Sequence, residues 1–197
     1  EEIKGLKPRL EAAYRLKDVL AGAPFSPFGS DRFADSRDRA LANRLVTLAL
    51  RHHGQITKVL EGVLSKGVPG RSGIVEAVLR LGVAQLLYAP DLGDHSALHL
   101  SVEAVRRDRR AGRFDKMVNG ALRSVQRDID RWRALGPELL FPDWLAERWR
   151  DQYGEEALQG FADALVAGAP LDITFKEGAD AAVIDALGAE PILGASH

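Results

Sequence analysis

The sequence predicts an all-α protein: a helical bundle, then a helical linker, then the opening β-α-β elements of a truncated α/β module. Residues 74–88 are apolar except for Glu76, Arg80 and Gln85. This run is too long for a typical strand, and its apolar character nearly all the way round is typical of a helix buried among others. Residues 114–132 instead have an apolar stripe at i, i+3, i+4, i+7 spacing opposite a basic face, as in an amphipathic helix.

Turn residues and hydrophobic periodicity divide the rest of the chain into shorter elements. Ser36 precedes one apolar-periodic stretch and is a candidate N-cap, because its hydroxyl can accept a hydrogen bond from a free backbone N–H. Trp144, Leu145, Trp149 and Tyr153 are expected to face inward from a short helix near the C-terminal end. The further helices are expected at residues 6–21, 36–53, 55–65, 94–110, 143–153 and 155–167.

The pattern changes after residue 170. The sequence LDITFK alternates like a strand, GADAAVIDALGA is helical in character, and EPILGAS resembles the start of a second strand. We therefore expect a bundle domain at 1–136, a helical linker at 137–170, and the start of a further module at 171–197. Because the chain begins at Glu1 and this module stops early, we expect it to be part of a longer protein.

Composition excludes several classes of function for this chain. The sequence has no cysteine, which rules out disulfides, thiolate zinc sites and a cysteine nucleophile. The lack of cysteine also fits a reducing cytoplasm, so a cytoplasmic location is expected. No apolar run reaches the roughly 18 residues of a transmembrane helix, so no membrane partner is expected. Charge is divided unevenly: residues 1–136 have 24 basic and 16 acidic side chains, whereas residues 137–197 have 3 and 12. The basic part could meet nucleic acid.

The basic side chains concentrate between residues 106 and 133, where ten are basic and four acidic. Arginine and lysine neutralise phosphates, and arginine also stacks on unpaired bases. A solvated face, partly paired with Asp108, Asp115, Asp128 and Asp130, is the alternative. The candidate RNA-binding residues are Arg106, Arg107, Arg109, Arg110, Arg113, Lys116, Arg123, Arg127 and Arg131.

Other polar residues have simpler interpretations. Arg80 and Glu103 lie in otherwise apolar helices, so a half-buried ion pair, or Arg80 paired to Glu76, is favoured, and Asn119 is expected to be a buried hydrogen-bonding residue. His95 and His99 have i,i+4 spacing, but no third ligand is evident and the HExxH pattern is absent, so no metal site is expected. No GxSxG motif and no glycine-rich loop after a strand occur. We therefore expect no catalytic residue and no cofactor site within this chain.

Four segments together resemble a known fold family. They are RALANRLVTLALR (39–51), VLRLGVAQLLYA (78–89), DHSALHLSVEAVRR (94–107) and MVNGALRSVQR (117–127). They resemble the successive helices of the NusB-like RNA-binding fold. The version most similar is the N-terminal domain of the RsmB/Sun/Fmu family of bacterial 16S ribosomal RNA cytosine-5 methyltransferases, because LALRHHGQI, FPDWLAERWRDQYG and LDITFKEGADAAVIDALGA are also similar to segments of that family.

The resemblance implies a role that the residues alone do not. Such an enzyme transfers a methyl group from S-adenosylmethionine to a cytosine, using two cysteines in a Rossmann-like domain, and none of that machinery matches this chain. It implies that the chain docks structured 16S rRNA, without a DNA partner, beside its own C-terminal methyltransferase domain. Two alternatives stay open: a stand-alone NusB-like transcription antitermination factor, and a helical module that only packs on its own catalytic domain.

Overall fold

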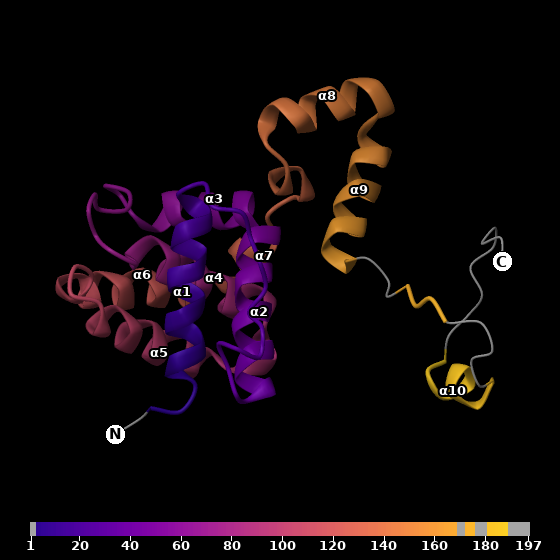
Figure 1. The fold of residues 1–197 in the computed structure, drawn as a ribbon. Coiled ribbons are helices and arrows are strands. Elements are labelled where there is room, and N and C mark those ends of the chain that lie inside the picture. Colours follow the sequence, from indigo (N-terminus) through magenta and orange to yellow (C-terminus); the bar gives the residue numbers. More distant parts are fainter. Residues whose placement is uncertain (1–2, 169–171, 176–180, 189–197) are drawn as a thin grey trace. The chain divides into compact units, whose positions relative to one another are not determined.

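The computed structural model describes residues 3–168, 172–175 and 181–188, and all regular structure within them is helical (Figure 1). The chain divides into two compact units, Glu1–Val166 and Ala167–His197, which we describe separately. In the first unit the α-helices are α1 (Leu6–Leu20), α2 (Ser36–Arg51), α3 (His53–Val63), α4 (Val75–Tyr88), α5 (Asp94–Arg107), α6 (Asp115–Arg127), α7 (Ile129–Arg133), α8 (Asp143–Tyr153) and α9 (Glu155–Ala167). Short 3-10 turns lie at η1 (Pro90–Leu92), η2 (Gly112–Phe114) and η3 (Pro137–Leu140).

In the second unit, the predicted β-α-β order is wrong for its first strand, which is the predicted strand with described residues. Residues 172–175 are not a strand, although their sequence alternates. A strand requires a hydrogen-bonded neighbour, and the described residues contain no other strand to pair with them. Within the described residues, the predicted helix is present as α10 (Ala181–Ala186), and the second predicted strand lies outside the described residues. The domain boundaries expected at 136 and 170 stay predictions.

The first unit is built around α4, as the apolar run predicted. Every residue from Ala77 to Leu87 is buried, including the polar Arg80 and Gln85. Helices α1, α2, α3, α5, α6 and α7 all pack against α4. A helix covered on so many sides can have no polar face, which explains why its sequence lacks the amphipathic pattern of α6.

Gly82 is the point of closest approach in this core. A Cβ atom built there would lie 2.8 Å from both Cδ atoms of Leu122 on α6 and 3.1 Å from the hydroxyl of Ser101 on α5. Real Cβ atoms essentially never approach another atom so closely, so a larger residue here would force the Leu122 side chain to shift. Both helices therefore pack close to the α4 backbone at this residue.

The predicted helix over 114–132 is interrupted. The helix α6 ends at Arg127 and α7 begins at Ile129, with Asp128 between them. The break directs Trp132 against α3, where a Cβ on Gly62 would lie only 2.5 Å from its ring. Packing of the tryptophan therefore overrides the helical periodicity of the sequence.

Two predicted helix ends also differ. The N-cap of α2 is Asp35 rather than Ser36, because its carboxylate accepts a hydrogen bond from the backbone N–H of Arg37 at 2.7 Å. The helix α5 ends at Arg107 rather than near residue 110. There Asp108 accepts hydrogen bonds from the backbone N–H groups of Arg110 and Ala111, each at 2.8 Å, and turns the chain.

Within α8 and α9, the aromatic residues are not all inward. Trp149 packs edge-on between Phe141 and Phe161, with ring centroids 5.1 and 5.0 Å away. Trp144 is 65% exposed and Tyr153 is 53% exposed, so the prediction that they face inward is wrong. Trp144 lies about 140° around the helix from Trp149, since each residue advances the helix by roughly 100°. Tyr153 ends α8, and its ring packs edge-on against Phe161 with centroids 5.8 Å apart.

Candidate nucleic-acid interface

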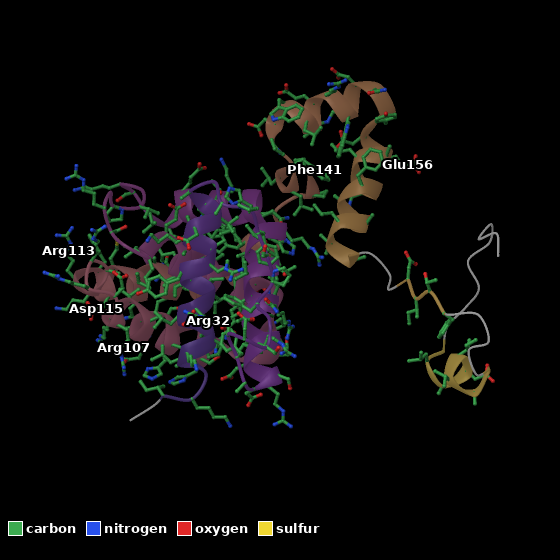
Figure 2. The ribbon with its side chains drawn as sticks, in the orientation of Figure 1. Arg32, Arg107, Arg113, Asp115, Phe141 and Glu156 are labelled. Atoms are coloured by element: carbon green, nitrogen blue, oxygen red, sulfur yellow. The ribbon has the colours of Figure 1, made fainter. Side chains whose placement is uncertain are left out.

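The nine predicted RNA-binding side chains all lie exposed on one continuous stretch of the bundle. Two come from the end of α5, three from the turn and η2 that follow, three from α6 and one from α7. Figure 2 shows Arg107 and Arg113 at the edge of the bundle formed by α5 and α6, with Asp115 between them. The nine side chains, here called the basic face, are Arg106, Arg107, Arg109, Arg110, Arg113, Lys116, Arg123, Arg127 and Arg131.

The turn after α5 explains why Arg109 and Arg110 project outward. The carboxylate of Asp108 is used by backbone N–H groups within the turn, and Ala111 is fully buried beneath it. With the backbone fixed in this way, the two arginines have no route into the core. They have no ion-pair partner within 4.0 Å among the residues that the structure describes.

Arg106 differs from the rest of the basic face because it is held by two carboxylates. Its guanidinium lies 2.8 Å from Glu103 on its own helix and 3.0 Å from Asp115 at the start of α6. The hydrogen bond from Arg106 lowers the pKa of Asp115, and the bonds to Asp115 and Glu103 raise the pKa of Arg106. Arg106 is therefore a link between two helices, and its charge is already neutralised locally.

Several of the remaining basic side chains have weaker partners. The guanidinium of Arg113 lies 4.7 Å from the ring centroid of Phe114, and that of Arg131 lies 4.6 Å from Trp132. Arg127 lies 3.9 Å from Asp128, at the limit of an ion pair. Surface contacts of these kinds are worth about 0–1 kcal/mol, so these side chains can turn toward a phosphate at small cost.

A groove of about 420 Å³ runs between α5 and α6 beside the basic face. The sequence alone does not predict this groove, because its lining comes from two different helices. The i,i+4 spacing of His95 and His99 is the feature of the sequence that points to this place. In the structure their rings stack with centroids 5.8 Å apart. The groove is lined by His95, Leu98, His99, Val102, Arg106, Asp115, Lys116, Asn119, Arg123 and Gln126.

Each of the three polar residues that were expected to be structural, Arg80, Glu103 and Asn119, bonds to a neighbouring side chain. Arg80 donates to Glu76 at 3.0 Å and to the hydroxyl of Thr57 at 3.0 Å. Its ion pair is therefore the one with Glu76 on the same helix, α4. Glu103 pairs with Arg106 rather than with Arg80. Asn119 is half-buried rather than buried, and its side-chain oxygen accepts a hydrogen bond from Arg123 at 3.3 Å.

Two kinds of site are absent from the part of the chain that the structure describes. No three His, Cys, Asp or Glu side chains are gathered there in a way that could hold a metal ion. No described helix combines the length and apolar character that crossing a membrane requires.

These features define a class of protein: an all-helical bundle with a basic outer face. Residues 20–127 match the model of the NusB family, and the chain belongs to that family. It is 30% identical over 161 residues to the probable ribosomal RNA small subunit methyltransferase B of Bacillus subtilis (strain 168), covering 76% of this chain and 35% of that protein.

Two further relatives have the same name without "probable". The ribosomal RNA small subunit methyltransferase B of Xanthomonas campestris pv. campestris is 34% identical over 134 residues, covering 66% of this chain and 29% of that protein. The one from Escherichia coli O1:K1 / APEC is 29% identical over 127 residues, covering 61% and 28%. The chain thus spans about a third of the length of these curated relatives.

Proposed function

We propose that this chain is the RNA-binding N-terminal region of a 16S rRNA 5-methylcytosine methyltransferase. In this proposal the bundle docks structured rRNA, and a separate catalytic domain, using S-adenosylmethionine, modifies the cytosine in the cytoplasm. The single observation that supports the docking role most directly is that the exposed Arg109 and Arg110, at the turn after α5, have no ion-pair partner among the described residues. Membership of the NusB family and similarity to the named methyltransferases support the remainder.

The chemistry of this docking is electrostatic. Each phosphate that a lysine or arginine neutralises releases a condensed counterion, so affinity falls steeply as salt rises. Phosphate contacts position an RNA without reading its sequence. The choice of cytosine therefore belongs to the catalytic domain, and the rigid helices supply only a fixed array of positive charge.

Charge reversal tests the basic face. The variant Arg109→Glu/Arg110→Glu should bind a structured 16S rRNA fragment much more weakly than the wild type, with an unchanged circular dichroism spectrum. Arg37→Glu/Lys58→Glu is the matched control, because it changes the net charge equally at exposed positions on α2 and α3. Equal binding by the first variant and the wild type would remove the basic face from the proposal.

The methyltransferase part needs its own test. Blotting the native cell with an antibody raised against this chain should give a band at about twice the 21.5 kDa of the chain or more, because the chain spans only about a third of the length of the methyltransferases that it resembles. A band at 21.5 kDa instead would contradict the methyltransferase proposal and favour a stand-alone RNA-binding factor.

A further inference from the structure

The groove between α5 and α6 has the composition of a site for a single nucleotide. Its volume of about 420 Å³ falls within the range of roughly 300–1,000 Å³ that is usual for small-molecule sites. Leu98 and Val102 give it an apolar surface, while α6 supplies amide and basic side chains opposite. Such a mixture suits a planar, partly polar ring attached to a phosphate.

The cations available in the groove lie on α6. Lys116 and Arg123 are both exposed, and neither has a carboxylate within 4.0 Å among residues 3–168. Arg106 is neutralised by Glu103 and Asp115 and instead joins the two helices at this end of the groove. A phosphodiester therefore finds two positive charges on one wall of the groove that no described carboxylate holds in an ion pair, with Asp115 beside Lys116.

The imidazoles of His95 and His99 provide aromatic surface on the opposite wall. Both side chains are exposed, and their planes lie 23° from parallel. No metal-binding cluster in the described residues includes them, so their rings are available to a ligand. Aromatic rings, including histidine, are surfaces on which unpaired bases stack.

Two amides could bond to the edge of such a base. The oxygen of Asn119 accepts a hydrogen bond from Arg123, whereas its amide nitrogen has no protein partner in the described part of the chain. The nitrogen of Gln126 donates to Asp94 at 3.2 Å, and its oxygen accepts no hydrogen bond from the described residues, while the side chain lines the groove. One donor and one acceptor are thus presented along the same helix.

We propose that this groove binds an unpaired nucleotide of RNA, with its base against His95 and His99 and its phosphate at Lys116 and Arg123. The proposal rests on the proposed function and names the part of the RNA that is recognised. Base-paired RNA does not fit it, because the bases of an A-form duplex are stacked inside the helix and cannot enter a groove between two helices.

The test compares RNAs that differ only in their bases. Fluorescence anisotropy with the full chain would use a labelled single strand of about 12 nucleotides, within the roughly 4–16 nucleotides that single-strand binders cover, together with an abasic strand and a duplex of the same length. The wild type should bind the strand with bases roughly tenfold or more tightly than the abasic strand. The variant His95→Ala/His99→Ala should lose this preference while keeping its affinity for the abasic strand.

Controls separate the groove from the rest of the protein. His53→Ala removes an imidazole from α3, outside the groove, and should keep the preference for bases. Asn119→Leu removes the amide at similar side-chain volume and should reduce the preference independently of the histidines. Circular dichroism would establish that each variant is folded.

The outcomes distinguish this inference from the proposed function. Binding of all three RNAs with equal affinity, or a preference that survives in His95→Ala/His99→Ala, would overturn the nucleotide site and leave the basic face intact. Equal competition by polyglutamate would also overturn it, because only charge would then be recognised. Failure to bind any RNA would instead contradict the proposed function itself.

Discussion

The imidazole of His52 lies flat against the phenol ring of Tyr88, with ring centroids 3.6 Å apart and planes 9° from parallel. The hydroxyl of Tyr88 and Nδ1 of His52 both contact the side-chain oxygen of Gln55, at 3.1 and 2.8 Å. The nitrogen of Gln55 donates to the carbonyls of Leu135 and Gly136, so its oxygen is the acceptor and Nδ1 of His52 has the proton. This cluster ties the α2–α3 corner and the end of α4 to the chain as it leaves α7.

This cluster makes stability depend on pH. Burial lowers the pKa of His52 below its usual value of about 6.5, so the unfolded chain binds a proton that the folded protein does not. The stability due to neutral His52 is present above pH ~6.5 and is lost as the pH falls through the lowered pKa. Burial lowers the pKa of His53 as well, in the same direction.

Urea unfolding at pH 8, 6.5 and 5 measures this effect. The free energy of unfolding should fall below pH ~6.5 in the wild type, and the fall should be smaller in His52→Gln and smallest in His52→Gln/His53→Gln. His52→Gln should also be less stable than the wild type at pH 8, because the substitution removes the ring that stacks on Tyr88. An equal fall in all three proteins would show that other groups cause the pH dependence.

The hydroxyl of Tyr88 gives a second prediction. Burial raises the pKa of Tyr88 to about 12, so it should remain protonated while exposed tyrosines ionise in an ultraviolet titration. Tyr88→Phe should lower the free energy of unfolding by about 0.5–1.5 kcal/mol, the usual net value of one hydrogen bond. Tyr14→Phe is the control, because it removes an exposed hydrogen bond to Asp108 and should cost less.

Gly82 provides a third prediction. Gly82→Ala places a methyl group 2.8 Å from the Leu122 side chain, and such overpacking should destabilise the protein by about 1–3 kcal/mol. Gly120→Ala, on α6, meets nothing within 4 Å and should stabilise by about 0.5–1 kcal/mol through better helix propensity. Chemical denaturation of both variants measures the difference. A stabilising Gly82→Ala would mean that Leu122 moves aside at little cost.

The sequence could predict features that one segment encodes by itself. The burial of α4 follows from a run that has no polar face, and the exposure of Lys116, Arg123 and Arg127 on α6 follows from their place opposite an apolar stripe. Both are properties of a single helix. They need no knowledge of how the helices are arranged.

Features that depend on two segments could not be read in this way. No glycine or proline in the sequence marks the break at Asp128. The break accompanies the contact of Trp132 with Gly62, which lies on another helix, so the sequence around Asp128 does not reveal it. The groove requires the rotation of α5 relative to α6, which core packing sets. The alternation of residues 172–175 resembled a strand, but alternation alone supplies no partner.

The salt dependence of RNA binding should separate the members of the basic face. Each free side chain that neutralises a phosphate should contribute about 0.7–0.9 to the slope of log affinity against log salt. Arg109→Ala should therefore reduce this slope by nearly one, whereas Arg106→Ala should reduce it less, because Glu103 and Asp115 already neutralise Arg106.

Anisotropy titrations at several potassium chloride concentrations measure these slopes. Arg44→Ala is the control, since it removes an exposed arginine of α2 that is paired with Asp91 and lies outside the basic face. Its slope should equal that of the wild type. Equal slopes for Arg106→Ala and Arg109→Ala would show that RNA displaces the carboxylates from Arg106. The bridge between α5 and α6 would then open on binding, and the groove beside it would change shape with it.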